Sequence, residues 1–433
     1  MTSPAEIRRT ANTRRNFLKA AALSAPLVPY LFSSRQVTAA AKNDRLQFAA
    51  IGVGGRGSEL ADQTKAFGDL VAVCDVDRNH AARARERSGG KADIFGDYRK
   101  LLERKDIDAV TIGTPDHWHV PIAIAACRSG KDVYCEKPLT LTVQEGQELV
   151  RVVKETGRVL QVGSQQRSEF GGLFLKAVAI VHAGRLGKLK NVLVSQPAAP
   201  VGGPFATQPV PEHLDWDMWL GQTPKVDYIP QRCHGTFRYW FEYSGGMMTD
   251  WGAHHVDIAH WGMGMQNTGP EKIDGRADLP TIKNGYNTPS EFEVDMVYPG
   301  GLPVKLLVKK GARSGVLFEG EKGRIFVNRG TLSGKPVDQL ADDPLPEEAI
   351  SKLYRGKQPG SHMRNFVDCV RSRELPISDV ESQHRTTTAL HLANISIRLG
   401  RPIKWNPKTE TITDDEEATA MLSRKPREGY EWL

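Results

Sequence analysis

Cysteine is scarce in this chain. Only five occur among 433 residues, an odd number, and they are scattered through apolar segments as Cys74, Cys127, Cys135, Cys233 and Cys369. Scaffolds that depend on disulfides carry an even set of cysteines at regular spacings. The sequence therefore excludes a disulfide framework, and we expect these side chains to be buried thiols.

An excess of charge of one sign is also lacking over most of the chain. The formal net charge of +7 comes from 58 Lys plus Arg and 51 Asp plus Glu. Residues 1–41 hold six of the basic residues and one of the acidic residues, so 52 and 50 remain beyond them, a net charge of +2. A nearly neutral chain offers no electrostatic basis for a nucleic-acid partner or an anionic membrane surface.

The apolar run near the start of the chain is short. It covers residues 20–32 and contains Pro26 and Pro29, so it cannot span a bilayer as a helix. No repeat with a period of 20–50 residues follows it, which argues against a solenoid or a propeller.

Two adjacent arginines, Arg14 and Arg15, precede this apolar run, and three alanines at positions 39–41 follow it. A basic start, a short apolar run and small residues are typical of a cleaved export signal. We predict that residues 1–41 form a twin-arginine signal peptide that engages the twin-arginine export machinery. The mature protein is then expected to be periplasmic or exported, without a stable membrane span. An uncleaved anchor or a disordered tail is the alternative.

From residue 42 the sequence alternates short apolar segments with segments of helical periodicity. This order is expected when helices cover both faces of a parallel sheet. The pattern predicts an α/β fold with a doubly wound dinucleotide-binding domain of the Rossmann type over residues 42–166. Its predicted strands are 47–51, 70–74, 109–112, 133–135 and 159–162, and its predicted helices are 58–67, 121–129 and 143–156.

Beyond residue 166 the strand candidates follow one another without helices between them, which indicates antiparallel pairing. We predict an α+β domain over residues 167–433, with a mostly antiparallel open sheet, for substrate binding and oligomerisation. One sheet face could line a cleft or pair with a second subunit, so a homo-oligomer is expected. The predicted elements are a helix at 173–182, strands at 292–298, 304–309, 316–319 and 325–328, and a helix at 385–399 that could pack back across the first domain.

A glycine turn at residues 52–57 lies between the first predicted strand and a helix. Gly52 permits the tight turn, Gly54 lets the backbone approach a pyrophosphate, and Gly57 lets the helix pack closely on the strand. Asp75 ends the next strand, where a carboxylate bonds ribose hydroxyls and repels a 2'-phosphate. NAD is therefore the expected cofactor. Because Arg78 lies nearby, NADP remains an alternative cofactor.

Two further segments carry groups suited to catalysis. Lys137 follows the predicted strand 133–135, and ligands of doubly wound sheets bind beyond the carboxyl ends of the strands. If residues 250–262 form a helix, Asp250, His254 and Asp257 share one face of it. An acid and a base would then point the same way.

Together these segments resemble the glucose-fructose oxidoreductase and inositol dehydrogenase family, usually called Gfo/Idh/MocA. The resemblance covers about residues 45–400 and includes the turn, Thr114-Pro115 with His119, Glu136-Lys137-Pro138, and two glycines before Asp250. It implies a Rossmann domain joined to an α/β domain with an open sheet, and NAD(P)-dependent oxidation of sugars or cyclitols. It implies a catalytic trio of Lys137, Asp250 and His254, and a cofactor held by Gly52, Gly54, Arg56, Gly57, Asp75, Thr114, Pro115, His119, Glu136 and Lys137.

The chemistry of these residues suggests a mechanism. Neutral His254, near a helix N-terminus that disfavours its charged form, would take the proton of a substrate hydroxyl as hydride leaves. Asp250 would orient His254, and Lys137 would stabilise negative charge on the reacting oxygen. The alternative is that Asp250 is a helix cap and His254 a core histidine.

A metal site built from His254, His255, Asp257 and His260 is a further possibility. Adjacent histidines diverge around a helix, and no cysteine or distant histidine completes a ligand set in the sequence. We therefore expect no metal.

Aromatic residues are concentrated in one segment. Five of the eight tryptophans fall within 46 residues, at positions 216, 219, 240, 251 and 261. Aromatic faces suit stacking on sugar C–H surfaces, which favours a carbohydrate substrate, although a hydrophobic core or a subunit interface explains them equally. The residues predicted to contact substrate are Arg167, Arg238, Trp251 and Asp257.

Export limits the types of reaction that such an enzyme could catalyse, because free nicotinamide cofactor is scarce outside the cytoplasm. The cofactor should be loaded before export and kept, so that each turnover restores it. Oxidation of one sugar with reduction of another does so, as in the exported glucose-fructose oxidoreductase. A glycosidase, lyase or epimerase that borrows and returns a hydride is the alternative, and a non-catalytic sugar or cofactor sensor is a third possibility.

Overall fold

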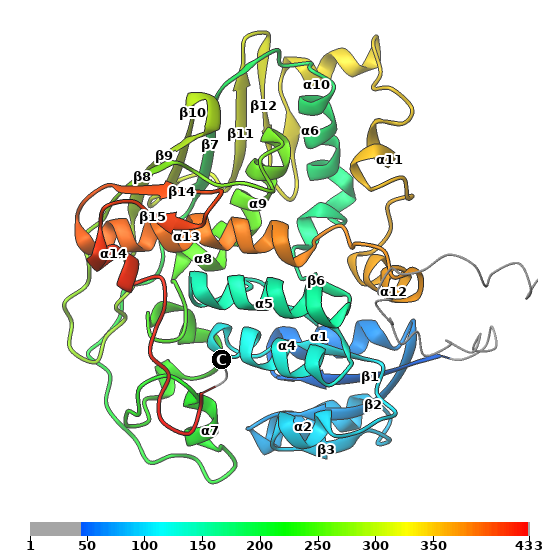
Figure 1. Ribbon diagram of the computed structural model, residues 1–433, viewed down its shortest axis with the longest axis vertical. Coiled ribbons are helices and arrows are strands. Elements are labelled where there is room, and N and C mark those ends of the chain that lie inside the picture. Colours follow the sequence, from blue (N-terminus) through cyan, green and yellow to red (C-terminus); the bar gives the residue numbers. More distant parts are fainter. Residues whose placement is uncertain (1–44, 432–433) are drawn as a thin grey trace, which may run out of the picture. The chain divides into compact units, whose positions relative to one another are not determined.

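Residues 45–431 are described by the computed structural model, and they contain two β-sheets (Figure 1). The predicted signal at residues 1–41 lies outside the described residues. The first sheet has six strands in the order β3-β2-β1-β4-β5-β6, and the second has nine in the order β13-β12-β11-β7-β10-β9-β8-β14-β15. The α/β fold class predicted from the sequence is confirmed.

All neighbouring strands of the first sheet run parallel. Its strands are β1 Leu46–Ile51, β2 Gly68–Cys74, β3 Asp93–Phe95, β4 Ala109–Ile112, β5 Asp132–Cys135 and β6 Leu160–Val162. Its helices are α1 Gly55–Thr64, α2 Arg78–Arg87, α3 Tyr98–Leu102, α4 His119–Arg128 and α5 Val143–Thr156. The five predicted strands are confirmed; the sequence missed β3, which is short and has half-exposed or exposed side chains.

Helix α5 shows why some boundaries could be predicted to the residue. Thr142 and Glu145 form a capping box at its start, and Gly157 ends it in the left-handed region at φ 62°. Both signals are local, so they are readable from sequence alone.

The second sheet is mostly antiparallel, but β10 pairs with β7 in parallel. The four predicted strands are confirmed as β9 to β12, and the sequence missed β7, β8, β13, β14 and β15. The strands are β7 Leu189–Gln196, β8 Lys272–Arg276, β9 Phe292–Tyr298, β10 Leu302–Val308, β11 Gly315–Gly320, β12 Gly323–Val327, β13 Leu332–Ser333, β14 Ile403–Asn406 and β15 Thr411–Ile412.

Helices from the second half of the chain pack on both sheets. Helices α6, α9 and α13 lie against the second sheet, and α13 also packs on α5, as expected (Figure 1). The helices of this half are α6 Leu173–His182, α7 Trp216–Leu220, α8 Met247–Asp250, α9 Gly252–Met263, α10 Lys335–Asp338, α11 Ala349–Leu353, α12 His362–Ser372, α13 Val380–Leu399 and α14 Glu416–Ala420.

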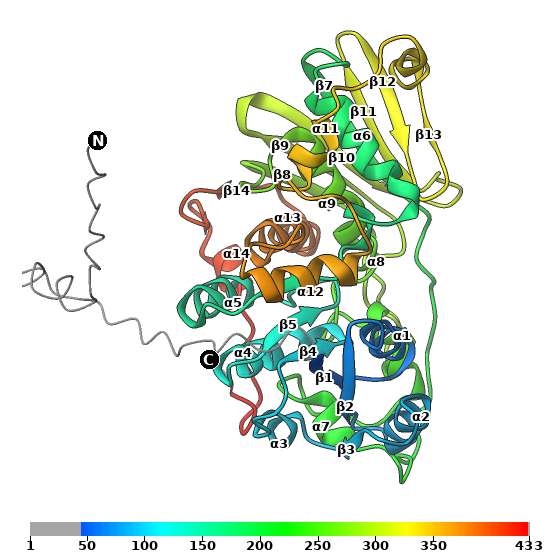
Figure 2. The same ribbon diagram turned by 90° about the vertical axis from the view of Figure 1, so that its right-hand side faces the viewer.

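Helix α12 belongs to the packing of the first sheet, although it comes late in the chain. Phe366 and Val367 of α12 join Phe48 and Ala50 of β1 in one hydrophobic cluster. Figure 2 shows α12 between α13 and the parallel strands. Core contacts therefore cross the domain boundary that was predicted at residue 166.

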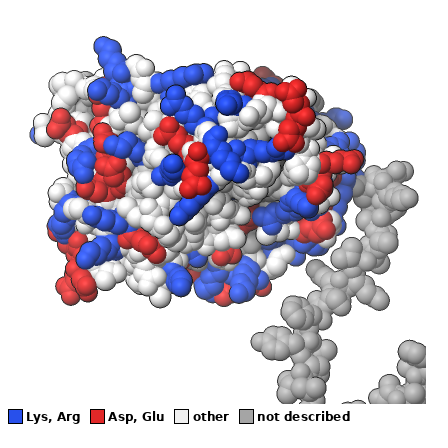
Figure 3. Space-filling view, turned by 90° about the horizontal axis from the view of Figure 1, so that it is seen from above, with Lys and Arg blue, Asp and Glu red and all other residues white. Residues whose placement is uncertain are grey.

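The five cysteines are free and buried, as expected. Over residues 45–431, no helix combines the length and the hydropathy needed to cross a membrane. On the face drawn in Figure 3, basic and acidic side chains are interspersed and form no continuous basic surface.

A buried ion pair joins the end of the first sheet to α9. The Arg167 and Asp257 side chains are 2% and 0% exposed, and Nε of Arg167 lies 2.9 Å from Oδ2 of Asp257. Ser164 and Gln383 also donate to Asp257, at 2.8 and 2.7 Å. Arg167 donates a further bond to the carbonyl of Ile377 at 2.7 Å. Every polar group of this network is therefore paired, as burial requires.

We expect Arg167→Met to lower the free energy of unfolding by about 3–5 kcal/mol, because it leaves the Asp257 carboxylate buried without its cation. The matched control is Arg276→Met, whose ion pairs with Asp274 and Asp295 are exposed and contribute at most about 1 kcal/mol. Denaturant titration of both variants measures the two losses. Equal, small losses would show that the buried pair is not a structural constraint.

Candidate active site

The glycine turn lies between β1 and α1 and has the geometry of a phosphate-binding turn. Gly52 has φ +75°, which favours glycine, and a Cβ on Gly57 would lie 1.7 Å from the carbonyl oxygen of Gly52. No side chain fits at Gly57, so α1 packs directly on the turn. Gly54, Arg56 and the first turn of α1 line a cavity of about 320 Å³.

Asp75 follows β2 and faces the same cavity. Its carboxylate accepts hydrogen bonds from the backbone N–H of Val53 at 2.8 Å and of Asp77 at 2.9 Å. The backbone thus fixes a carboxylate where a ribose would bind. Arg78 instead donates to the carbonyl of Glu212 at 2.5 Å.

A second cavity of about 280 Å³ continues from the first, and Arg56, Gly113, Thr114 and Arg238 line both. Lys137 and His254 from the predicted trio line this second cavity. Lys137 comes directly after β5, and His254 lies in the first turn of α9. The two halves of the chain therefore each supply one reactive side chain.

Asp250, at the end of α8, binds Lys137 rather than His254. Nζ of Lys137 lies 2.6 Å from Oδ1 of Asp250, and Nε of Arg238 lies 3.3 Å from the same oxygen. Burial opposes ionisation of Asp250, but the two cations outweigh it, so its pKa is lowered. Among the described residues no hydrogen bond joins Asp250 to His254, which corrects the predicted orienting role. The carboxylate positions the two cations.

His254 is neutral for identifiable reasons. Its side chain is 5% exposed, and Nδ1 has no hydrogen-bond partner among the described residues. Burial, followed by the positive charges of Lys137 and Arg329, lowers the pKa of His254 well below 6.5. An unpaired, uncharged imidazole facing a cavity can accept a proton from a bound molecule.

The neighbouring histidines of α9 point to other partners. His255 lies 3.1 Å from Gln166 and 3.0 Å from Ser314, and His260 bonds the hydroxyl of Tyr298. Each ring is held by a separate part of the core. These side chains do not converge on a common point with His254.

The other predicted cofactor residues lie around these two cavities, and Glu136 and His119 line the second. Glu136 accepts from Nε of Arg56 at 2.9 Å and from Gln165 at 2.8 Å. His119 lies between the carbonyls of Pro138 and Thr114, at 2.7 and 3.0 Å, and so ties the loop after β4 to the loop after β5. Pro115 lines the first cavity beside Thr114.

The four predicted substrate contacts are placed differently from one another. Arg238 lines both cavities. Arg167 and Asp257 are buried in their own ion pair and line neither cavity, so this geometry assigns them a structural role. Trp251 also lines neither cavity; its ring supports Arg329, whose guanidinium lies 4.6 Å from the ring centroid.

Arg329 and Asp116 are two of the cavity residues that the sequence missed. Arg329 follows β12, stacks between Trp251 and Phe170, and lines the second cavity. Asp116, after β4, lines it as well. Arg329 carries no sequence signal, because its loop is distant along the chain. Asp116 lies beside the recognised Thr114-Pro115 pair, which was an available signal.

The aromatic segment forms a core of its own rather than a stacking surface. Trp216, Trp219 and Trp240 are buried in one cluster, and the first two rings stack at 4.7 Å. Of these three, only Trp219 lines the first cavity. The hydrophobic-core explanation accounts for most of these rings.

Comparison with protein families agrees with this geometry. Residues 46–164 match the NAD-binding Rossmann fold of the Gfo/Idh/MocA oxidoreductase family. Residues 202–432 match the C-terminal alpha/beta domain of the same family. The chain belongs to the Gfo/Idh/MocA oxidoreductase family.

Several proteins are similar to this chain. An inositol 2-dehydrogenase of Salmonella paratyphi B is 30% identical over 221 residues, which span 50% of this chain and only 54% of that protein. The scyllo-inositol 2-dehydrogenase (NAD(+)) of Bacillus subtilis is 25% identical over 71% of this chain and 81% of its own. An alpha-N-acetylgalactosaminidase of Shewanella oneidensis is 32% identical over 41% of this chain and 44% of its own.

Among solved structures, the WlbA dehydrogenase of Bordetella pertussis, crystallised with NADH and UDP-GlcNAcA, has the same fold. The TM-score is 0.63 at 19% identity, over 84% of this chain and 99% of that one.

Asp116 introduces a pH dependence into the stability of this protein. Its carboxyl is 4% exposed, and burial raises its pKa to about 7, against the opposing effects of Arg238 and Ser244. A raised carboxyl pKa means that the folded protein binds a proton that the unfolded chain has released. Asp116 therefore destabilises the fold increasingly as the pH rises from about 4 to about 7.

In Asp116→Asn this penalty is absent. We expect the unfolding free energy of the variant, relative to the wild type, to rise by up to about 1.4 kcal/mol per pH unit between about pH 4 and 7. Denaturant titrations of both proteins at several pH values measure the difference. A difference that stays constant over this range would show that Asp116 is ionised throughout.

Proposed function

We propose that this chain is an NAD-dependent oxidoreductase that transfers hydride between a nicotinamide and a secondary hydroxyl of a sugar, glycoside or cyclitol. The observation that carries the proposal is the continuity of the two cavities. A cavity along the glycine turn leads to a cavity that holds Lys137 and His254. A dinucleotide along the first places its reactive end at the second.

The residues of the second cavity divide the chemistry between them. When bound, the nicotinamide supplies the acceptor for the hydride and its electron pair. Neutral His254 takes the hydroxyl proton, and Lys137 donates a hydrogen bond to the reacting oxygen and stabilises its negative charge. Asp250 holds Lys137 and Arg238 in place through the contacts at 2.6 and 3.3 Å.

The geometry around Asp75 favours NAD over NADP. A carboxylate beside the ribose position repels a 2'-phosphate. The guanidinium of Arg78, which could have neutralised that phosphate, is engaged with the carbonyl of Glu212.

A polyol substrate fits the groups that surround His254. The second cavity is lined by charged and polar side chains, including Asp116, Gln165 and Arg329, which can bond several hydroxyls. The inositol 2-dehydrogenases among its relatives support the same substrate class. Which carbon reacts depends on how these groups orient the ring.

We further propose that the chain is exported through the twin-arginine pathway and works outside the cytoplasm with NAD retained from before export. The support is Arg14-Arg15, the apolar run and the small residues that follow. The five buried free thiols suit a protein that is folded before it crosses the membrane.

We also propose association of copies of this chain through the face of the second sheet that α6, α9 and α13 leave uncovered. Leu193 and Leu317 are cross-strand neighbours on this face. Both are half-exposed, and so are Leu307 and Phe326. Sedimentation of the purified chain measures the assembly, and a monomer at all concentrations would contradict it.

The glycosidase, lyase or epimerase that returns its hydride is a second candidate. It is favoured by the similarity to an alpha-N-acetylgalactosaminidase, although that similarity covers 41% of this chain. Such an enzyme leaves no net reduced cofactor after turnover. A sensor would bind sugar or cofactor and turn over neither.

We expect His254→Ala to lower kcat at least about 100-fold while nucleotide binding is unchanged, because the proton acceptor is lost and the glycine-turn cavity is intact. The control is His182→Ala, an exposed histidine of α6. In the wild type, the acidic limb of kcat should lie well below pH 6.5, since the pKa of His254 is lowered. Near-normal turnover of His254→Ala would contradict the assignment.

We expect the purified exported protein to carry bound nucleotide and to reduce it when a polyol substrate is added without free NAD. The near-ultraviolet absorbance of reduced nicotinamide measures this. The control is Arg14→Lys with Arg15→Lys, which should remain in the cytoplasm and carry the same nucleotide.

The same experiment separates the candidates. Substrate conversion without net reduction of the cofactor would support hydride borrowing. Bound nucleotide with no conversion of any polyol or glycoside would support the sensor, and absence of nucleotide would contradict retention.

A further inference from the structure

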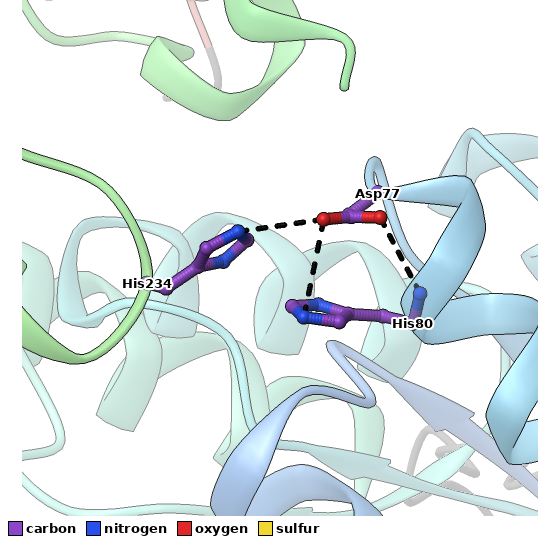
Figure 4. Close-up of side chains that lie close together, drawn as sticks. All are labelled: Asp77, His80 and His234. Carbon is purple, nitrogen blue, oxygen red and sulfur yellow. Dashed lines mark hydrogen bonds and ion pairs between the residues drawn. The ribbon is translucent and has the colours of Figure 1, made fainter. Parts of the chain in front are cut away.

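A cluster of imidazoles and a carboxylate lies at the rim of the first cavity, away from Lys137 and His254. It consists of Asp77 and His80 at the start of α2 and His234 from the loop before α8 (Figure 4). One ligand atom from each of the three lies within 4.8 Å of the others. His213 lies beside them, with Nε2 at 3.7 Å from Oδ2 of Asp77, but it is not one of the three residues whose ligand atoms all lie within 4.8 Å of one another. We propose that these residues, the Asp77 cluster, bind a zinc-class transition-metal ion.

The spacing within the Asp77 cluster matches tetrahedral coordination. A zinc ion with bonds of about 2.0–2.1 Å holds its ligand atoms about 3.3 Å apart. From Oδ2 of Asp77, Nε2 of His234 lies at 3.4 Å and Nε2 of His80 at 3.9 Å. The spacing of His234 and Asp77 matches two ligands of one zinc ion, whereas His80 must move closer to Asp77 when the ion binds.

The chemistry of the ligands selects the metal. Imidazole nitrogens suit zinc, copper and nickel, whereas calcium and magnesium prefer sites built from oxygen. A cluster with two imidazoles and one carboxylate, and a third imidazole at His213 beside Asp77, therefore favours zinc.

The surroundings of the cluster hold the ligands in place. Oδ1 of Asp77 accepts the N–H of Asn79 at 2.8 Å, which leaves Oδ2 available. Nδ1 of His80 lies 3.5 Å from the Asp75 carboxylate, the partner that a metal-binding histidine uses for its other ring nitrogen. The backbone at His213 is fixed by the N–H of Arg78 at 2.9 Å.

His234 is held in an unfavourable conformation that directs its ring toward Asp77. Its φ of +49° lies in the left-handed region, which side chains rarely adopt. The sequence predicted no metal because the four ligands come from three separate segments.

A bound metal would connect α2 of the first sheet to two loops of the second half. His80 and His234 both line the cavity beside the glycine turn, so the connection lies at its rim. We infer that the metal restrains these loops and slows nucleotide release. This consequence rests on the proposed function, whereas metal binding does not.

The test uses the mature chain without a polyhistidine tag, stripped with a chelator and titrated with Zn²⁺ and Co²⁺. We expect one ion per chain and the intense visible absorption of tetrahedral cobalt. His234→Ala should weaken metal affinity at least about 100-fold, since even residues behind the ligands change it 10–100-fold. His182→Ala, outside the cluster, should bind metal like the wild type.

Failure of the wild type to bind either ion, or equal affinity in His234→Ala, would overturn the site. An unchanged cobalt spectrum in His213→Ala would overturn the fourth ligand. If the metal restrains the two loops, release of bound NAD should accelerate at least about tenfold when the metal is removed. An unchanged release rate would overturn this effect of the metal. A chain without nucleotide would contradict the proposed function, and metal stoichiometry would still decide the site.

Discussion

The position of the candidate active site depends on one buried ion pair. Arg167 lies shortly after β6, the last strand of the parallel sheet. Asp257 lies in the middle of α9, one turn beyond His254. Because both charges are enclosed, any separation of the two halves would leave an unpaired charge in a medium that solvates it poorly. The pair therefore fixes α9, and with it His254, against the carboxyl ends of β4 and β5.

Charge balance around the second cavity follows from that placement. Three cations, Lys137, Arg238 and Arg329, lie near one ionised carboxylate, Asp250. Positive charge, added to burial, keeps His254 neutral. For Asp250 the same positive charge outweighs the opposing effect of burial and lowers its pKa. The same field suits a site where negative charge develops on a substrate oxygen. Asp116 is the exception, since burial raises its pKa to about 7 despite these cations.

Much of the fold could be predicted because its signals are local. Capping residues and a terminal glycine define α5 to the residue. Mostly apolar segments define β1 and β4, and the start of β9 alternates apolar with acidic residues. The strands that were missed lack such signals: β3 has no buried side chain, and β8 contains a glycine and three charged residues. Helix α12 was missed although it has local signals, since Ser361 caps its start and its apolar residues share one face. Its packing against β1, more than three hundred residues earlier, could not be read from sequence.

The sequence by itself determined the glycine turn, the carboxylate at Asp75 and the presence of Lys137 and His254, since each occupies a fixed position relative to a strand or a helix start. Only the tertiary structure decided which groups they face. Asp250 was expected to orient His254 and instead forms an ion pair with Lys137. Arg167 and Asp257, both expected to contact substrate, pair with each other. Side-chain partners from distant segments depend on how the two sheets pack, and no local periodicity encodes that distance.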